Sequence, residues 1–293
     1  MKPIKIAFFG TPQNAAIVLE KLVQTKYKPG LIITTPDVQQ GRGQKLQESP
    51  VKTLASVHGI DVLEPEDLEN PEFVKSFKNF APGVAILVAY GKIIPQEVLN
   101  IPRLGFLNIH PSLLPKYRGP SPIYEVILAG DKRTGVTIIK LDPELDHGPI
   151  LAQKELEIEN ADTHQSIMEK TAILGGDLLI EILPGYLDRS IKPKPQNHSG
   201  ATYTEKIEKQ NGLIDLNSPP DPKTLNRMIR AYFPWPTVWA EIETRDTKNG
   251  IRKFKIKFLP ENKIQPEGKR PMSLKEFQNG YPNISQQIST LFD

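Results

Sequence analysis

Residues Gly105–Ile123 read GFLNIHPSLLPKYRGPSPI, and the interpretation of the whole chain depends on them. The first of these residues alternate as a strand does, so Asn108 and His110 share one face while Ile109 lies on the other. Pro111 ends the strand, because proline has no N–H to donate to a neighbouring strand. The sequence therefore predicts an amide and an imidazole side by side at the carboxyl end of a strand, where ligands bind in open α/β sheets.

The loop behind this strand is basic and stiff, since it contains Lys116, Arg118 and several prolines. A lone histidine such as His110 is more often a hydrogen-bonded structural residue than a catalytic one. Because His110 shares one strand face with Asn108, a functional role is supported as well as a structural one. Both interpretations stay open on the evidence of this stretch alone.

Apolar runs and helical patterns alternate from the N-terminus onward. Residues 4–10 (IKIAFFG) predict a buried strand, residues 15–22 have helical spacing, and residues 31–34 form a second β-branched run. Residues 83–90 (GVAILVAY) predict a central strand buried on both faces. This order predicts an α/β, Rossmann-like domain with a mostly parallel sheet. Its first turn, GTPQNAA, lacks the G-x-G-x-x-G pattern, so no nicotinamide or flavin cofactor is predicted.

Composition excludes several classes of site. The chain has 293 residues and no cysteine, which rules out disulfides, thiolate zinc sites and cysteine nucleophiles. Its five histidines show no H-E-x-x-H spacing, so no metal site is predicted. The N-terminus lacks a signal-like apolar region and no run reaches the length of a membrane span, so we expect a cytoplasmic protein with no membrane partner. The oligomeric state expected is a monomer.

The net charge of +3 is unevenly distributed. Residues 201–293 hold 15 Lys and Arg against 11 Asp and Glu, an excess of four positive charges. A basic C-terminal part beside a near-neutral body is compatible with a polyanionic partner, although a small excess of lysines is also typical of an ordinary solvated surface.

The proline-rich segment near residue 190 separates two parts of the chain. We expect a first domain over 1–189, a linker over 190–204 and a C-terminal domain over 205–293. In the C-terminal part, PWPTVWAEI and IRKFKIKF alternate as half-buried antiparallel strands, and residues 260–273 are expected to be irregular. This pattern predicts a small β-rich domain.

The segment 35–51 (TPDVQQGRGQKLQESPV) is expected to be a long loop without regular structure, because it is polar and rich in glycine and proline. Arg42 lies between two glycines and Lys45 follows closely, an arrangement that suits contact with phosphates. A mobile linker with incidental charges explains the same residues, and both interpretations remain open.

Two further turns carry candidate residues. An apolar turn after the central strand, residues 88–95 (VAYGKIIP), suits a flat and partly apolar ligand as well as ordinary packing. Asp146 lies in a turn just before the next strand and has meaning only if the fold brings it to His110. An amide, an imidazole and a carboxylate without a Ser or Cys nucleophile suit stabilising an oxyanion and moving protons while a substrate supplies the nucleophile.

These residues and their surroundings resemble the folate-dependent formyltransferases. The motif SLLP-x-x-RG-x-x-PI occurs at 112–123, and further matching motifs follow one order over nearly the whole chain: GTP (10–12), TPD…GRG-x-K-L…SPVK (35–52), VAYG-x-I-x-P (88–95), LD-x-G-x-x-L (145–151), R-A-x-x-PWP-x-x-W (230–239) and QPEGKRPMS (265–273). The resemblance is strongest to the branch of the family that formylates methionine carried by tRNA.

The resemblance implies transfer of a formyl group from 10-formyltetrahydrofolate to the α-amino group of methionine on initiator tRNA. It implies a catalytic triad of Asn108, His110 and Asp146, in which the amide and the protonated imidazole stabilise the oxyanion and the carboxylate helps to take the proton from the amine. It also implies tRNA contacts by Arg42, Lys45, Lys116 and Arg118. The implied folate-binding residues are Val88, Ala89, Tyr90, Gly91, Ile93, Ser112, Leu113, Leu114, Pro115 and Asp142.

The chain departs from the family pattern at two places. Gln13 and Asn14 follow GTP where the family usually has an acidic residue and an aromatic one, close to the methionyl end of the substrate. The C-terminal part is also short, so we expect a truncated OB-like barrel that does not close. Two alternatives remain: a sugar-nucleotide N-formyltransferase, and a catalytically silent tRNA-binding protein.

Overall fold

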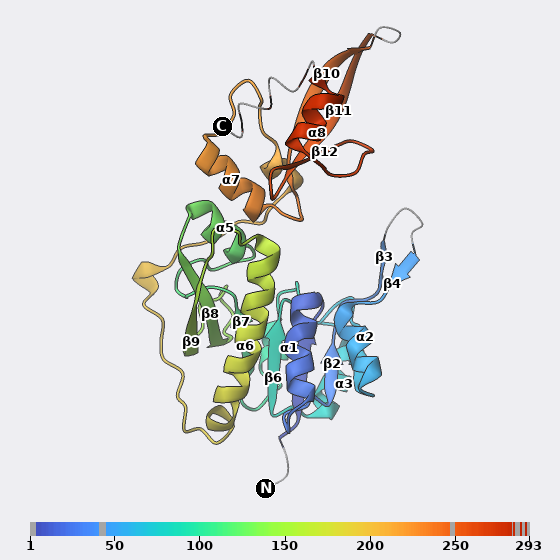
Figure 1. Cartoon of the computed structure of the whole chain (residues 1–293). Coiled ribbons are helices and arrows are strands. Elements are labelled where there is room, and N and C mark those ends of the chain that lie inside the picture. The colour runs from blue at the N-terminus through green and yellow to red at the C-terminus, as the bar shows by residue number, and fades with distance from the viewer. Residues whose placement is uncertain are drawn as a thin grey trace. The chain divides into compact units, whose positions relative to one another are not determined.

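The computed structural model describes residues 4–40, 45–246 and 250–282, together with Ile284, Ile288 and Leu291. The chain forms two compact units that interleave along the sequence (Figure 1). The first unit consists of residues 1–119, 133–157 and 168–203, and the second consists of residues 120–132, 158–167 and 204–293.

The first unit is built on a seven-stranded sheet with the order β5-β2-β1-β6-β7-β8-β9. Five of these strands, β5 to β7 in that order, run parallel, and β8 and β9 add an antiparallel ribbon at one edge. This arrangement confirms the α/β fold with a mostly parallel sheet. The strands are β1 (Ile6–Gly10), β2 (Leu31–Ile33), β5 (Asp61–Leu63), β6 (Val84–Val88), β7 (Phe106–His110), β8 (Arg133–Lys140) and β9 (Ile150–Glu157).

Helices cover both faces of this sheet. One core contains side chains of α1 (Gln13–Val23), α2 (Pro50–Val57) and the residues after 167 in α6 (His164–Leu187). The opposite core contains side chains of α3 (Pro71–Phe80) and α4 (Gln96–Leu99). The sheet is therefore buried on both sides, which explains why its central strands are apolar at nearly every position.

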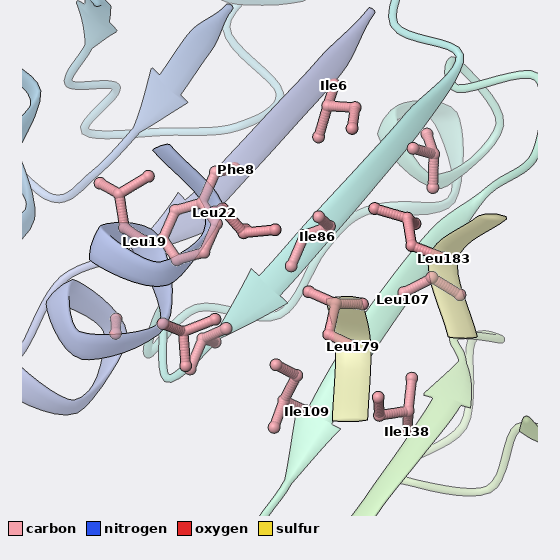
Figure 2. Close-up of a cluster of buried hydrophobic side chains, with 14 of the residues drawn as sticks. Ile6, Phe8, Leu19, Leu22, Ile86, Leu107, Ile109, Ile138, Leu179 and Leu183 are labelled. Carbon is pink, nitrogen blue, oxygen red and sulfur yellow. The ribbon is translucent and has the colours of Figure 1, made fainter. Parts of the chain in front are cut away.

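Strand β1 shows how the period of two divides its side chains between the cores. Ile6 and Phe8 belong to the core with α1, whereas Ala7 and Phe9 belong to the core with α3. Figure 2 shows the first of these cores, where Leu19 and Leu22 of α1 lie near Phe8 and where Leu179 and Leu183 of α6 lie beside β7.

Two helices of the first unit begin with the same local signal. Ser49 caps α2 by accepting a hydrogen bond from the backbone N–H of Lys52 at 3.0 Å, and Asn70 caps α3 by accepting from Glu72 and Phe73. Each cap is followed by proline, which suits the first helical position because no intrahelical bond is lost there.

The segment 35–51 contains regular structure, contrary to the sequence-based expectation. Strands β3 (Val38–Gln40) and β4 (Lys45–Gln47) pair antiparallel as a two-stranded sheet. The two large apolar residues of these strands, Val38 and Leu46, are exposed, so burial does not impose an apolar alternation through them. Residues 41–44, including Arg42, lie outside the described residues.

The second unit contains a four-stranded antiparallel sheet with the order β10-β11-β12-β13. This sheet confirms a small β domain at the C-terminus. Residues 260–273 are not irregular as expected, because they supply two of its strands. Its elements are α5 (Pro122–Ala129), α7 (Pro222–Ala231), β10 (Val238–Asp246), β11 (Gly250–Leu259), β12 (Lys263–Pro266), β13 (Met272–Ser273), α8 (Leu274–Gly280) and a 3-10 turn, η2 (Lys209–Gly212).

The chain between α6 and the second unit lies along the first unit with specific backbone contacts. Lys194 pairs with Ile150 at the start of β9 through two hydrogen bonds of 2.7 Å. Arg118 and Tyr203 form an isolated parallel bridge, and a short 3-10 turn, η1 (His198–Gly200), lies between these pairings. None of the helices in the described part of the chain is long and apolar enough to span a bilayer.

Candidate functional site

The candidate site lies at the carboxyl end of β7. Asn108 is the third residue of this strand and His110 is its last, and both side chains are buried. Asp146 is also buried and lies in the turn between β8 and β9, with a left-handed φ of 47°. β8 pairs antiparallel with β7, with Lys140 opposite Leu107, so the turn after β8 begins beside the start of β7 and folds back for Asp146 to reach Asn108 and His110.

The structure brings these three side chains together. The Asn108 amide donates to Oδ1 of Asp146 at 3.3 Å, and His110 Nδ1 lies 3.5 Å from Oδ2 of the same carboxylate. The backbone N–H of Gly119 donates to that Oδ2 at 2.8 Å. Asp146 therefore joins an amide, an imidazole and a backbone N–H in one buried polar cluster.

The second nitrogen of His110 identifies the protonation of its ring. Nε2 lies 2.9 Å from the carbonyl oxygen of Tyr117, and a carbonyl oxygen only accepts hydrogen bonds, so Nε2 carries a proton. Nδ1 faces the carboxylate of Asp146 at 3.5 Å. The ring is thus held between the Tyr117 carbonyl and the Asp146 carboxylate.

The loop after β7 is held in place by its own hydrogen bonds and by β8. The Ser112 hydroxyl donates to the carbonyl of Lys116 at 2.7 Å, while Thr137 of β8 donates to the carbonyl of Ser112 at 2.6 Å. Thr137 also accepts from the N–H of Leu114, and Gln153 of β9 donates to the carbonyl of Leu114 at 2.7 Å. The residues 112–115 implied in folate binding are therefore part of a rigid edge of the site.

The turn after β6 has the features expected of a ligand-binding edge. Ala89 and Gly91 both have left-handed backbones, and a Cβ added at Gly91 would meet no atom within 4 Å. Ile93 is 88 % exposed although it is a large apolar residue. The Tyr90 hydroxyl is buried without a hydrogen-bond partner among the described residues, and burial raises its pKa to about 12. These features fit a flat and partly polar group lying against Val88–Ile93.

Asp142 forms its contacts within the turn that it begins. Its Oδ2 accepts from or pairs with Nδ1 of His147 at 2.7 Å, and Oδ1 accepts from the backbone N–H of Glu144 at 3.1 Å. The His147 ring stacks on His198 with centroids 4.1 Å apart. The structure therefore gives Asp142 a role in ordering the turn that carries Asp146, beside its implied role in folate binding.

Arg118 does not lie on the surface as a tRNA contact would. It is 2 % exposed, and its Nη2 lies 2.7 Å from Oε1 of Gln196 and 2.8 Å from Nδ1 of His198. Its Nη1 donates to the Tyr203 hydroxyl at 3.2 Å. The burial contradicts the expectation that Arg118 faces RNA, because its donors point into the protein. The charge alone could not reveal this, since its partners lie 78 to 85 residues away.

The other basic candidates are placed differently. Lys116 is exposed on the loop after β7, and Lys45 begins β4. At the base of that hairpin, Lys52 bonds Asp37 at 2.7 Å and Glu64 at 3.0 Å. Hydrogen bonds from these two carboxylates raise the pKa of Lys52. This ion triplet fixes the point from which the hairpin leaves the sheet.

Asn14, one of the two departures from the family pattern, lies in the first turn of α1. Its amide donates to the thioether sulfur of Met168 at 3.2 Å, and its neighbour Gln13 is exposed. The position therefore presents an amide where an aromatic residue is usual. In the part of the chain that the structure describes, no group of three or more His, Cys, Asp or Glu side chains is arranged to hold a metal ion.

Gln196 is a residue of the site that the sequence did not single out. It belongs to the segment expected to be a linker, yet it is 5 % exposed and bonds the carbonyl oxygens of both Asp146 and Gly148. Its only sequence signal is a glutamine after a run of alternating prolines. The contact itself spans about 50 residues and is created by the fold.

Comparison with known proteins gives a consistent set of relatives. A family model described as formyl transferase matches residues 4–183. A methionyl-tRNA formyltransferase of Methylococcus capsulatus is 36 % identical over 98 % of this chain and 100 % of its own length. Among solved structures, a sugar N-formyltransferase from a Shewanella species has a TM-score of 0.64 at 18 % identity, covering 88 % of this chain and 98 % of its own.

A second solved structure has the same fold. HypX from Aquifex aeolicus, solved in complex with tetrahydrofolic acid, has a TM-score of 0.61 at 18 % identity and covers 87 % of this chain and 37 % of its own. At this identity both solved structures establish the likeness of fold alone.

Proposed function

The chain belongs to the formyl transferase family, and we propose that it transfers a formyl group from 10-formyltetrahydrofolate to the α-amino group of methionine on initiator tRNA. The observation that carries this proposal is the buried cluster of Asn108, His110 and Asp146 at the carboxyl end of β7. Support for the substrate comes from the similarity to a methionyl-tRNA formyltransferase over the full length of that relative.

The folate co-substrate supplies the formyl group. The residues that would hold it are those that line the edge beyond β6 and β7 or order the turn beside it: Val88, Ala89, Tyr90, Gly91, Ile93, Ser112, Leu113, Leu114, Pro115 and Asp142. The exposed apolar side chain of Ile93 and the open space at Gly91 favour a flat ring there. The rigid hydrogen bonding of Leu114 would keep the opposite wall fixed while the ligand binds.

In the proposed reaction the amine of methionine attacks the formyl carbon, and negative charge develops on the formyl oxygen. The Asn108 amide has two N–H donors, one of which already bonds Asp146, so the other is suited to that oxygen. Asp146 orients the amide and sustains the positive charge of His110. The same carboxylate, directly or through a water molecule, takes the proton that the amine loses. When the tetrahedral intermediate collapses, the bond between the formyl carbon and N10 of the folate breaks, and N10 takes up a proton, so that tetrahydrofolate leaves and the amine keeps the formyl group.

Contacts with tRNA are proposed for Arg42, Lys45 and Lys116. Lys45 begins β4, Arg42 precedes it in the sequence, and the exposed Lys116 lies on the loop after β7. The basic side chains of β11, such as Lys255, would add phosphate contacts from the second unit. We further propose that the protein acts as a cytoplasmic monomer.

A two-acceptor assay tests the proposed function. The protein is given 10-formyltetrahydrofolate with either methionyl-tRNA or an amino-sugar nucleotide, and formylation of each acceptor is measured. We expect formyl-methionyl-tRNA from the wild type and at least a thousandfold less from His110→Ala. Formylation of the sugar alone would support the sugar N-formyltransferase alternative. Equal and negligible transfer by both proteins, with tRNA binding retained, would support the silent tRNA-binding alternative.

A further inference from the structure

We propose that Gln196 is a positioning residue for Asp146: its amide clamps the backbone on both sides of His147 and thereby aims the carboxylate at Asn108 and His110. The inference rests on the proposed function, because it assigns Gln196 an effect on formyl transfer. It is carried by contacts that the triad itself does not require.

The Gln196 amide uses all of its polar atoms on the site. Nε2 donates to the carbonyl oxygen of Asp146 at 2.8 Å and to that of Gly148 at 2.7 Å. Oε1 accepts from Nη2 of the buried Arg118 at 2.7 Å. The orientation of the amide is thereby determined, since a flipped amide would face two carbonyl oxygens with its own oxygen and a guanidinium with its N–H groups.

The clamped turn needs such support. Asp146 has a left-handed backbone conformation, which residues other than glycine rarely adopt. Gly148 passes so close to β8 that an added Cβ would lie 1.9 Å from the carbonyl oxygen of Lys140. The conformation of this turn therefore depends on contacts with residues outside the turn. The side chain of Gln196 supplies two of these contacts, to the carbonyl oxygens of Asp146 and Gly148.

Gln196 is itself held from two sides. The pairing of Lys194 with Ile150 places the segment beside the start of β9, two residues before Gln196. On the other side, the guanidinium of Arg118 is fixed by His198 and Tyr203. Gly119, the residue after Arg118, donates its N–H to Oδ2 of Asp146. The amide of Gln196 and the N–H of Gly119 thus hold the backbone and the carboxylate of Asp146.

This arrangement distinguishes two isosteric substitutions. Gln196→Met keeps the length of the side chain and removes all three bonds. Gln196→Glu keeps an acceptor for Arg118, but it sets a carboxylate against the carbonyl oxygens of Asp146 and Gly148. The glutamate variant retains the contact that ties the segment to Arg118, so it tests the donor function when the methionine variant folds poorly. Gln24→Met is a matched control, because Gln24 is exposed and its amide bonds Glu20.

The experiment measures steady-state formylation of methionyl-tRNA and amide hydrogen exchange on the full-length protein. For Gln196→Met and Gln196→Glu we expect kcat to fall about 10- to 100-fold, with KM for each substrate within about threefold of the wild type. We also expect exchange at the Gly119 N–H to accelerate at least tenfold, while core amides of β1 and β6 keep their protection. The control Gln24→Met should match the wild type in every measurement.

The two readouts separate the possible failures. A kcat within twofold of the wild type in a folded Gln196 variant, or faster exchange spread evenly over Gly119 and the core strands, would overturn the proposal and leave Gln196 a purely structural residue. A wild type that formylates no methionyl-tRNA would refute the proposed function instead. Selective exchange at Gly119 would then still demonstrate the clamp.

Discussion

The carboxyl edge of β7 and the β10–β11 hairpin are both rich in polar side chains, but they use them in opposite ways. At the edge of β7, Asn108 reaches Asp146 across 38 residues of sequence and both are buried. In the hairpin, Lys255 lies 3.6 Å from Glu241 on the neighbouring strand, and each side chain is nearly half exposed. Lys255 also lies over the ring of Trp239 at 4.6 Å.

The two regions differ in whether water can replace a hydrogen-bond or charge partner that is lost. A buried donor or acceptor that loses its partner keeps the full cost of its lost hydration, whereas an exposed ion pair is solvated and screened when it breaks. Single changes at the edge of β7 should therefore have large effects on catalysis or folding. Single changes in the hairpin should have small effects that depend on salt.

The largest expected effect is that of Asp146→Asn. The substitution keeps the shape of the side chain and an acceptor for the Gly119 N–H, but it removes the carboxylate that lies 3.5 Å from Nδ1 of His110. We expect kcat for formyl transfer to fall about a thousandfold or more, with a small change in folate affinity. Single-turnover formylation and a folate-binding titration measure the two quantities.

The control for this variant is Asp177→Asn, because Asp177 forms an exposed ion pair with Lys21 at 2.6 Å. It should retain the wild-type rate. If Asp146→Asn kept more than a tenth of the wild-type kcat, the comparison would lose its premise that the buried carboxylate carries the chemistry.

Arg118→Met should have the next largest effect, on stability. It leaves Oε1 of the buried Gln196 without its donor and also removes the bond to Nδ1 of the exposed His198. Hydrogen bonds to charged groups contribute about 1.5–3 kcal/mol each, so we expect the free energy of unfolding in urea to fall by about 2–4 kcal/mol. Full stability combined with weaker tRNA binding would instead support the surface role that the sequence suggests for this residue.

Local patterns were sufficient to predict the parts of the molecule whose structure is local. The apolar runs predict β1, β2 and β6, and proline after a capping residue predicts the starts of helices such as α3. Alternation in residues 106–110 predicts that Asn108 and His110 share a face of β7. Each of these features is decided by neighbours a few residues away.

The remaining features depend on contacts between distant segments. The role of Asp146 could be inferred only from a family resemblance, because the turn that carries it is ordered by Gln196 and Gly119. The burial of Arg118 could not be inferred from a charged residue in a polar loop. Strands such as β3 and β12 have only three and four residues, which is too few for an apolar period to be recognised in the sequence.

A third prediction concerns His164, whose ring stacks on Tyr124 in the second unit with centroids 4.0 Å apart. Burial lowers the pKa of His164 to about 4 from its ordinary 6.5. The unfolded state therefore binds a proton below pH 6.5 that the folded state excludes, so stability is complete above that pH and declines as the pH falls toward 4. The full loss amounts to about 3 kcal/mol.

Replacement by phenylalanine keeps the stacking and removes this titration. Urea unfolding at pH 7.5 and pH 5 should show a loss of about 2 kcal/mol in the wild type that is largely absent in His164→Phe. His58→Phe, at a partly exposed site beside Glu20, is the control and should keep the wild-type loss. An unchanged loss in His164→Phe would mean that other groups govern the acid sensitivity of the second unit.

The smallest expected effect is that of Lys255→Gln in the hairpin. The substitution removes one positive charge from β11 and breaks two partly exposed contacts, the pair with Glu241 and the cation–π contact with Trp239, so stability should change by less than about 1 kcal/mol. If Lys255 contacts a tRNA phosphate, KM for methionyl-tRNA should rise about threefold in the variant. The slope of log affinity against log salt concentration should also become shallower by about one. The value of kcat should stay unchanged, because no reacting atom is contacted. Lys78→Gln is the matched control, since Lys78 forms an even more exposed pair with Glu97 in the first unit and should leave the salt slope unaltered. A fall in kcat for Lys255→Gln comparable to that of the Gln196 variants would erase the distinction between the two regions, because a screened surface charge would then be acting on the chemistry as the buried cluster does.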